Sequence, residues 1–192
     1  MDETAYFCCS IPGKTISKNR IPGRKKIKKR PIVAVTTNAD GSTEIPLLFV
    51  STARQPRFFG GKSVEELGIQ YANAAKCWMN TEHFTNWIVR FNKRMKCEGR
   101  RVLLLLDNVS SHRVTLPLVN VTVQMMPPNT TSFLQSQDAG IIQSYKSKLE
   151  QLKTRYIVSK FDELLDKAAE VGNENVETQI ESLYTVDVLQ AM

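Results

Sequence analysis

The feature that most constrains the fold is a run of consecutive apolar residues, Val102 to Leu106, which ends directly at Asp107. A strand that is apolar at every position is typical of a sheet covered on both faces, so we expect a central, fully buried strand here. Ligands of open α/β sheets bind beyond the carboxyl ends of the strands, which makes Asp107 a candidate site residue. The alternative is structural, with Asp107, Asn108 or Ser110 closing an Asx turn or capping a helix.

Short runs of β-branched and apolar residues predict further strands, at residues 4–9, 31–37, 45–50 and 119–126. The first three are expected to form a meander, because the turn sequence Asn-Ala-Asp-Gly separates the second from the third. The glycine-containing segment 55–75 is expected to be irregular. These strands, together with two predicted helices, favour an α/β fold.

The two helices are predicted from apolar residues at helical spacing. The first starts from a cap at Asn80 or Thr81 and ends near Gly99, and its apolar stripe is expected to pack against the sheet. The second starts at Asp138 and carries the apolar positions Ile141, Ile142, Tyr145, Leu149, Leu152 and Tyr156. This spacing places Asp138 on the apolar face, where a carboxylate costs desolvation unless a cation or a donor meets it. Either capping of the helix or a metal ion shared with Asp107 would meet that cost.

A basic segment lies near the start of the chain. Nine basic residues and no acid lie between Lys14 and Arg30, and they account for more than the whole net charge of +7. Prolines and glycines predict a loop, and the charge suits a polyanion such as a phosphate backbone. The candidate nucleic-acid-binding residues are Arg24, Lys25, Lys26, Lys28, Lys29 and Arg30. A solvated loop or a nuclear-localisation run would have the same composition.

Composition excludes several classes of protein. Hydrophobic residues make up 42% of the 192 residues and charged residues 23%, which argues against wholesale disorder. No apolar run approaches the roughly 18 residues that a membrane span needs, and residues 1–9 lack the pattern of a signal peptide. We therefore expect one soluble, intracellular domain with a short tail and no membrane partner.

Two stretches resemble a known family. LLLLDNVSSH at 103–112 and PPNTTSFLQSQDAGII at 127–142 are similar to the DDE-type transposase and endonuclease domain of the pogo, Tigger, Jerky and centromere protein B group, the DDE superfamily endonucleases. The resemblance extends through DET at 2–4, NADG at 38–41 and WMNTEHFTNW at 78–87, so it covers nearly the whole chain. Thirty residues separate Asp107 from Asp138, a spacing expected of pogo-like enzymes whose third acid is an aspartate.

The resemblance implies a fold and a site. The fold would be an RNase H-like mixed β-sheet flanked by helices, and the catalytic and metal-binding residues would be Asp2, Asp107 and Asp138. Asp2 follows from the resemblance alone, while Asn108 and His112 are expected only to support or cap. Two Mg²⁺ or Mn²⁺ ions would serve phosphodiester cleavage or strand transfer on DNA, in the nucleus. Replacing Asp107 with Asn is expected to stabilise the metal-free protein slightly, because one of several like charges is removed.

Other features weaken the prediction of activity. The chain begins one residue before Asp2, so residues 1–160 are expected to be a DDE endonuclease domain truncated in its first strand. The helix-turn-helix regions of the family are also missing. The alternative is a catalytically inactive, domesticated or decayed remnant that binds nucleic acid or protein. Residues 161–192 form a mostly acidic tail, compatible with a helix, which would serve packing, a homodimer or another protein partner.

Overall fold

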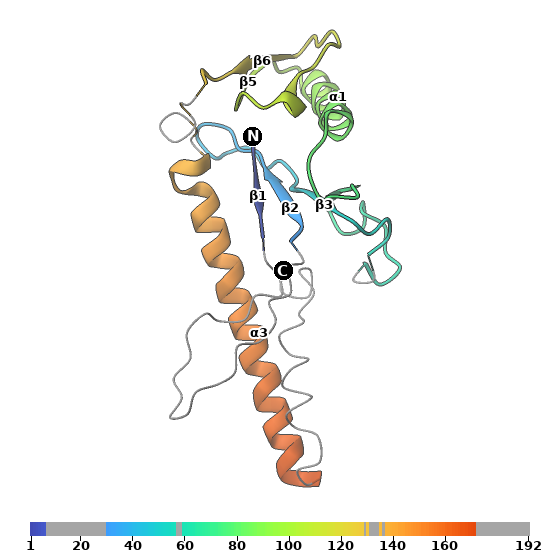
Figure 1. The fold of residues 1–192 in the computed structure, drawn as a ribbon, viewed down its shortest axis with the longest axis vertical. Helices are drawn as coiled ribbons and strands as arrows, with labels where there is room; N and C mark the ends of the chain where they lie inside the picture. Colours follow the sequence, from blue (N-terminus) through green and yellow to red (C-terminus); the bar gives the residue numbers. More distant parts are fainter. Residues whose placement is uncertain (7–29, 57–58, 129, 131–134, 136, 172–192) are drawn as a thin grey trace. The chain divides into compact units, whose positions relative to one another are not determined.

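A computed structural model describes residues 1–6, 30–56, 59–128, 130, 135 and 137–171 (Figure 1). The chain divides into two compact units, one of residues 1–5 and 31–144 and the other of residues 6–30 and 145–192. All strands of the described residues and helix α1 (Thr81–Cys97) belong to the first unit. In the described part of the chain, no helix is both long and apolar enough to cross a membrane.

The first sheet contains four strands in the order β1-β2-β3-β4. Their bounds are β1, Asp2–Ala5; β2, Ile32–Val35; β3, Leu48–Ser51; and β4, Gln70–Asn73. The first three pair antiparallel, which confirms the predicted meander, although β1 starts earlier than expected. The prediction that 55–75 is irregular throughout was wrong, because β4 pairs parallel to β3 within it. Backbone hydrogen bonds to β3, rather than apolar side chains, define this strand.

Helix α1 and the second sheet follow in sequence. Helix α1 spans Thr81–Cys97 and is capped as predicted by Asn80, whose side chain accepts a hydrogen bond from the His83 amide at 2.8 Å. Strands β5, Val102–Leu106, and β6, Val121–Met125, pair parallel to each other. Both strands lie where the sequence predicted them.

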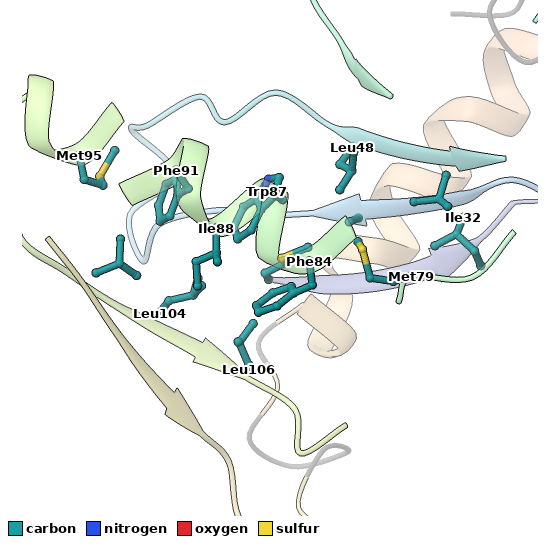
Figure 2. Close-up of a cluster of buried hydrophobic side chains, with 14 residues drawn as sticks. Ile32, Leu48, Met79, Phe84, Trp87, Ile88, Phe91, Met95, Leu104 and Leu106 are labelled. Carbon is teal, nitrogen blue, oxygen red and sulfur yellow. The ribbon is translucent and has the colours of Figure 1, made fainter. Parts of the chain in front are cut away.

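A single core joins the two sheets through α1. Figure 2 shows Phe84, Trp87, Ile88, Phe91 and Met95 of α1 beside side chains of both sheets. The contacts from the sheets include Ile32, Leu48, Leu104 and Leu106. Phe84 and Ile88 are completely buried, and a buried side chain of this size contributes about 1.5 to 3 kcal/mol to the free energy of unfolding. The expected packing of the apolar stripe of α1 against the sheet is therefore confirmed.

The prediction that β5 is buried on both faces was wrong. Leu104 and Leu106 belong to the core, but Leu103 and Leu105 are 61% and 49% exposed. Successive side chains of a strand point to opposite faces, so only alternate leucines can face α1. The apolar run therefore has one buried face in the described structure.

The segment after β6 differs from a simple helix starting at Asp138. Residues Gln137–Ile141 form the π-helical turn η3, and the long helix α3 spans Ile142–Val171. Gly140 interrupts the two with a φ of 136°, a backbone conformation that suits glycine. Asp138 is exposed, in contrast to the predicted position on a buried face, because this kink breaks the helical register before Ile142.

Candidate functional site

Strand β1 presents two adjacent acids to opposite faces of its sheet. Glu3 pairs with Ala34, a core residue on the face covered by α1, whereas Asp2 pairs with Val35. Paired residues of an antiparallel ladder share a face, so Glu3 points toward the α1 side and Asp2 toward the other. The main-chain nitrogen of Met1 donates to the carbonyl oxygen of Leu105 at 3.3 Å. This bond brings β1 beside the end of β5.

His112 lies between two carboxylates where these strands meet. It ends the short 3₁₀ helix η2, Ser110–His112, just after β5, and only 1% of its surface is exposed. Its Nε2 is 2.7 Å from Oε1 of Glu3, and its Nδ1 is 2.6 Å from Oδ1 of Asp107. The ring also packs against Phe84 of α1, with centroids 4.7 Å apart. The histidine therefore connects β1, the end of β5 and α1.

The charge of His112 follows from these contacts. A neutral imidazole can donate through only one nitrogen, whereas both nitrogens here face carboxylate oxygens. Burial by itself would lower the pKa of His112, but the contacts with Asp107 and Glu3 outweigh burial and raise the pKa to about 9. The residue is therefore an imidazolium ion at neutral pH.

Asp107 uses one of its oxygens for this contact. Its Oδ1 and the facing Nδ1 are sealed from water, and the N–H is not aimed directly at the oxygen, so the contact is an ion pair rather than a well-directed hydrogen bond. The whole side chain of Asp107 nevertheless keeps 18% of its surface exposed. Its exposed part thus remains available to another ligand.

Asp2 is under the influence of the other two predicted acids. Burial is the largest cause that raises its pKa to about 6, and the negative charges of Asp138 and Asp107 add to the rise. The amide of Glu3 donates to Oδ1 of Asp2 at 2.8 Å and acts in the opposite direction. Asp107 and Asp138, both far from Asp2 in sequence, therefore act electrostatically on it at this end of the sheet.

Asp138 reaches this end through turn η3. Its amide donates to the carbonyl of Gln135 at 3.1 Å, and the neighbouring side chain of Gln137 donates to Oγ1 of Thr37 at 3.2 Å. Thr37 lies two residues beyond Val35, the partner of Asp2 in the sheet. The turn is thus attached to the end of β2 that adjoins Asp2.

The donor chemistry of these side chains fits a hard divalent cation. Carboxylate oxygens are the ligands that Mg²⁺ and Mn²⁺ prefer, and a cation would offset both the burial and the neighbouring negative charges that raise the pKa of Asp2. Among the described residues, however, no three or more His, Cys, Asp or Glu side chains already converge as a metal site. The acids form an open group, and the ligand geometry is not preassembled.

The acids lie apart from a pocket of about 340 Å³ next to β3, β4 and α1. Arg54, His83 and Arg90 contribute to its lining, whereas none of the three aspartates does. This pocket is therefore not part of the group of three acids.

The structure describes only one of the predicted DNA-binding residues, and it adds one residue to the site. The candidate residues Arg24, Lys25, Lys26, Lys28 and Lys29 lie outside the described residues, and Arg30 is exposed. Sequence reasoning missed Glu3 as a functional residue and treated His112 only as a support or cap. The one local signal for Glu3 is its position beside Asp2, since its contact with His112 spans 109 residues.

A comparison with family models places this acid-bearing α/β unit in a known class. The model described as "DDE superfamily endonuclease" matches residues 28–184. The chain belongs to this family of DDE endonuclease domains, and the resemblance to the Tigger and centromere protein B group is confirmed.

Three relatives show the extent of the similarity. The chain is 27% identical to the mouse Tigger transposable element-derived protein 4 over 138 residues, covering 72% of this chain and 26% of the relative. It is 28% identical over 170 residues both to CENP-B homolog protein 2 and to ARS-binding protein 1 of Schizosaccharomyces pombe, covering 83% of this chain and 33% and 32% of those proteins. The chain thus spans about a quarter to a third of these relatives. No solved structure matches it significantly.

Proposed function

We propose that residues 1–160 act on DNA as a transposase-derived DDE endonuclease, by two-metal phosphodiester cleavage or strand transfer. The observation that supports this most is geometric: Met1, next to Asp2, donates to Leu105 near Asp107, and the turn that carries Asp138 is bonded to the end of β2 that adjoins Asp2. Chance placement of three acids would scatter them over the surface. Membership of the DDE endonuclease family supports the same assignment.

The proposed fold is RNase H-like. The antiparallel meander β1–β3, the helix α1 that follows it and the parallel pair β5–β6 support this proposal. The bond from Met1 to Leu105 brings the start of β1 beside the end of β5, although the described strands form two sheets. Asp2 and Asp107 would then face the same substrate.

The residues of the chain would have distinct roles. Asp2, Asp107 and Asp138 would hold Mg²⁺ or Mn²⁺, and Asp107 would use the part of its carboxylate that His112 does not contact. When bound, the two ions would activate a water or a 3′-hydroxyl and neutralise charge at the phosphate. His112 would keep Asp107 in place.

Nicking of supercoiled plasmid tests the proposal. We expect weak cleavage that depends on Mg²⁺ or Mn²⁺, stops with a chelator, and is lost in Asp107→Asn. Glu82→Gln, which removes an exposed acid in the first turn of α1, is the matched control and should leave cleavage unchanged. Metal binding by the wild-type protein should be measured in parallel. A protein that neither binds the ions nor cuts would contradict the enzyme proposal.

A catalytically inactive remnant is the second candidate. The absence of a preassembled metal site among the described residues favours it, and so does one relative whose name, ARS-binding protein 1, states a binding role. Such a protein would bind DNA or a protein partner without cutting. DNA binding that is unaffected by Asp2→Asn and by chelators, with no cleavage, would support this candidate.

The basic residues 24–30 are proposed to contact DNA phosphates, within a nuclear protein. Neutralising Arg24, Lys25, Lys26, Lys28, Lys29 and Arg30 should weaken nonspecific DNA binding and flatten its dependence on salt, because fewer counterions are released. An unchanged salt slope would assign the segment to solubility or nuclear import. We also propose that the acidic tail 161–192 contacts a second copy or another protein, which a truncation at residue 160 would test by its oligomeric state.

A further inference from the structure

We infer that Glu3 and His112 form a brace that positions Asp107 and joins β1 to the end of β5, and that Glu3 is a positioning residue rather than a fourth metal ligand. The inference rests on the proposed metal-binding role of the three aspartates and specifies what holds them in place. The brace consists of Glu3, His112 and Asp107, linked by the contacts of 2.7 and 2.6 Å.

The brace occupies a place where the backbone provides little connection. The described strands form two separate sheets, and β1 and β5 are not paired in a ladder. The main-chain bond from Met1 to Leu105 lies at the start of β1. One residue beyond Asp2, the side chain of Glu3 reaches His112, which in turn contacts Asp107. A side-chain link therefore substitutes for strand pairing next to two of the three acids.

Packing leaves the histidine ring little freedom. It is 1% exposed, contacts carboxylates on both nitrogens, and lies against Phe84, which is fully buried. The Oδ1 atom of Asp107 is sealed against this ring. Rotation of the Asp107 carboxylate is thus restricted, and its exposed part is held in one direction. Such partners fix the orientation of metal ligands, and their loss typically weakens metal affinity about 10- to 100-fold.

The position of Glu3 argues against direct metal binding. Glu3 points to the α1 face of β1, whereas Asp2 points to the opposite face. Its Oε1 is already in contact with Nε2 of His112. Binding a cation together with Asp2 would require Glu3 to leave that contact, and the buried Nε2 of His112 would lose its partner, which is costly whatever the charge of the ring.

Mn²⁺ affinity, measured from the signal of free Mn²⁺ by electron paramagnetic resonance, tests the brace independently of cleavage. We expect His112→Asn and Glu3→Gln each to weaken Mn²⁺ binding about 10- to 100-fold. The Mn²⁺ affinity of the double variant should be no lower than that of the single variant that binds more weakly, because both substitutions disrupt the same brace. His83→Asn, a partly exposed histidine of α1, is the matched control and should bind as the wild type does. If His112→Asn does not fold, the Mn²⁺ affinity of Glu3→Gln still tests the brace. This variant keeps His112 and its contact with Asp107, so we expect it to fold.

Cleavage gives a second readout when the wild type is active. Raising the Mn²⁺ concentration should restore the rate of the brace variants toward that of the wild type, because only affinity is lost. It should not rescue Asp107→Asn, which lacks a ligand. A purely structural role would instead lower the melting temperature without changing the metal concentration that gives half-maximal rate.

Three outcomes would overturn the inference, and they are distinguishable. Folded His112→Asn and Glu3→Gln variants with wild-type Mn²⁺ affinity would leave the proposed function intact but reject the brace. Additive losses, with Glu3→Gln as harmful as Asp2→Asn, would make Glu3 a metal ligand. A wild-type protein that binds no Mn²⁺ would reject the endonuclease proposal, and the brace would then have no metal ligand to position.

Discussion

The chain holds Asp107 and Asp138 in different ways. Asp107 follows a strand of the core and contacts His112, which is 1% exposed. Asp138 lies in turn η3 with its side chain exposed, and Gly140 interrupts the helix two residues later. Packing therefore determines the position of the first acid, whereas local backbone conformation determines that of the second. Changes around Asp107 should be felt in stability as well as in activity, and changes around Asp138 mainly in activity.

The largest expected effect is on catalysis. If the endonuclease proposal holds, Asp107→Asn should lower metal-dependent nicking by on the order of 100- to 1000-fold, because the amide lacks the charge that would neutralise a cation. Asp138→Asn should have an effect of similar size despite its exposed setting. Initial rates of plasmid nicking measure both. Equal activity of Asp138→Asn and the wild type would remove Asp138 from the site and leave the two packed acids.

The stability of the packed region around Asp107 and His112 should depend on pH. The pKa of His112 is raised from 6.5 to about 9 in the folded protein, so its stabilising effect is complete below pH 6.5 and is lost as the pH rises through 9. The free energy of unfolding should therefore fall by on the order of 3 kcal/mol across this range in metal-free buffer. Urea unfolding of the wild type and His112→Asn measures the effect, since other titrating groups cancel in the difference. If the free energies of unfolding of the two proteins changed with pH in parallel, this prediction would be contradicted.

Two charge-neutralising variants should change stability with opposite signs. Asp2 is a carboxyl group whose pKa is raised to about 6, so its ionised form destabilises the folded state above that pH. Asp2→Asn should therefore stabilise the metal-free protein at neutral pH by about 1 kcal/mol, after allowance for its partial exposure. Asp107→Asn should destabilise it by about 2 kcal/mol, because His112 loses an ion-pair partner.

The sequence predicts that Asp107→Asn stabilises the metal-free protein slightly, whereas the structure predicts that it destabilises it. The sequence shows the like charges of the aspartates, but it does not show that Asp107 contacts His112. Denaturant midpoints at neutral pH, with Glu82→Gln as the control, test the pair. A stabilised Asp107→Asn would show that repulsion among the aspartates exceeds the attraction to His112.

Elements that bury one face could be predicted from sequence. The stripe of α1, the cap at Asn80 and the strands β5 and β6 all follow from periodicity and turn residues. Strand β4 could not be predicted, because Gln-Tyr-Ala-Asn has no clear apolar alternation and is defined by backbone pairing with β3. The exposure of Leu103 and Leu105 was also missed, since sequence does not show that α1 covers one face of β5 alone.

The site residues also differ in whether a local sequence pattern could predict them. Asp107 and Asp138 became candidates through their positions after a strand and at a predicted helix start, and Asp2 became one only through family resemblance. The brace depends on residues 109 positions apart, and no local pattern links Glu3 with His112. Contacts of this kind are set by the packing of several elements, which a single sequence does not display.

The smallest expected effect concerns the backbone at Gly140. Its φ of 136° is strained for any residue with a Cβ, although open space surrounds the position where that atom would lie. Gly140→Ala should therefore destabilise the protein by only about 1 kcal/mol, or the turn should rearrange to relieve the strain. Rearrangement would move Asp138 while leaving Asp107 and His112 in place.

The control is Gly61→Ala, which also places a Cβ at a positive φ, of 81°, in a segment far from the three acids along the chain. Both variants should lose stability by denaturant unfolding, but only Gly140→Ala should weaken Mn²⁺ binding and nicking. The chemical shifts of His112 should remain those of the wild type in both, because the packed region does not depend on η3. Equal losses of activity in the two variants would mean that general destabilisation, rather than the placement of Asp138, limits the site.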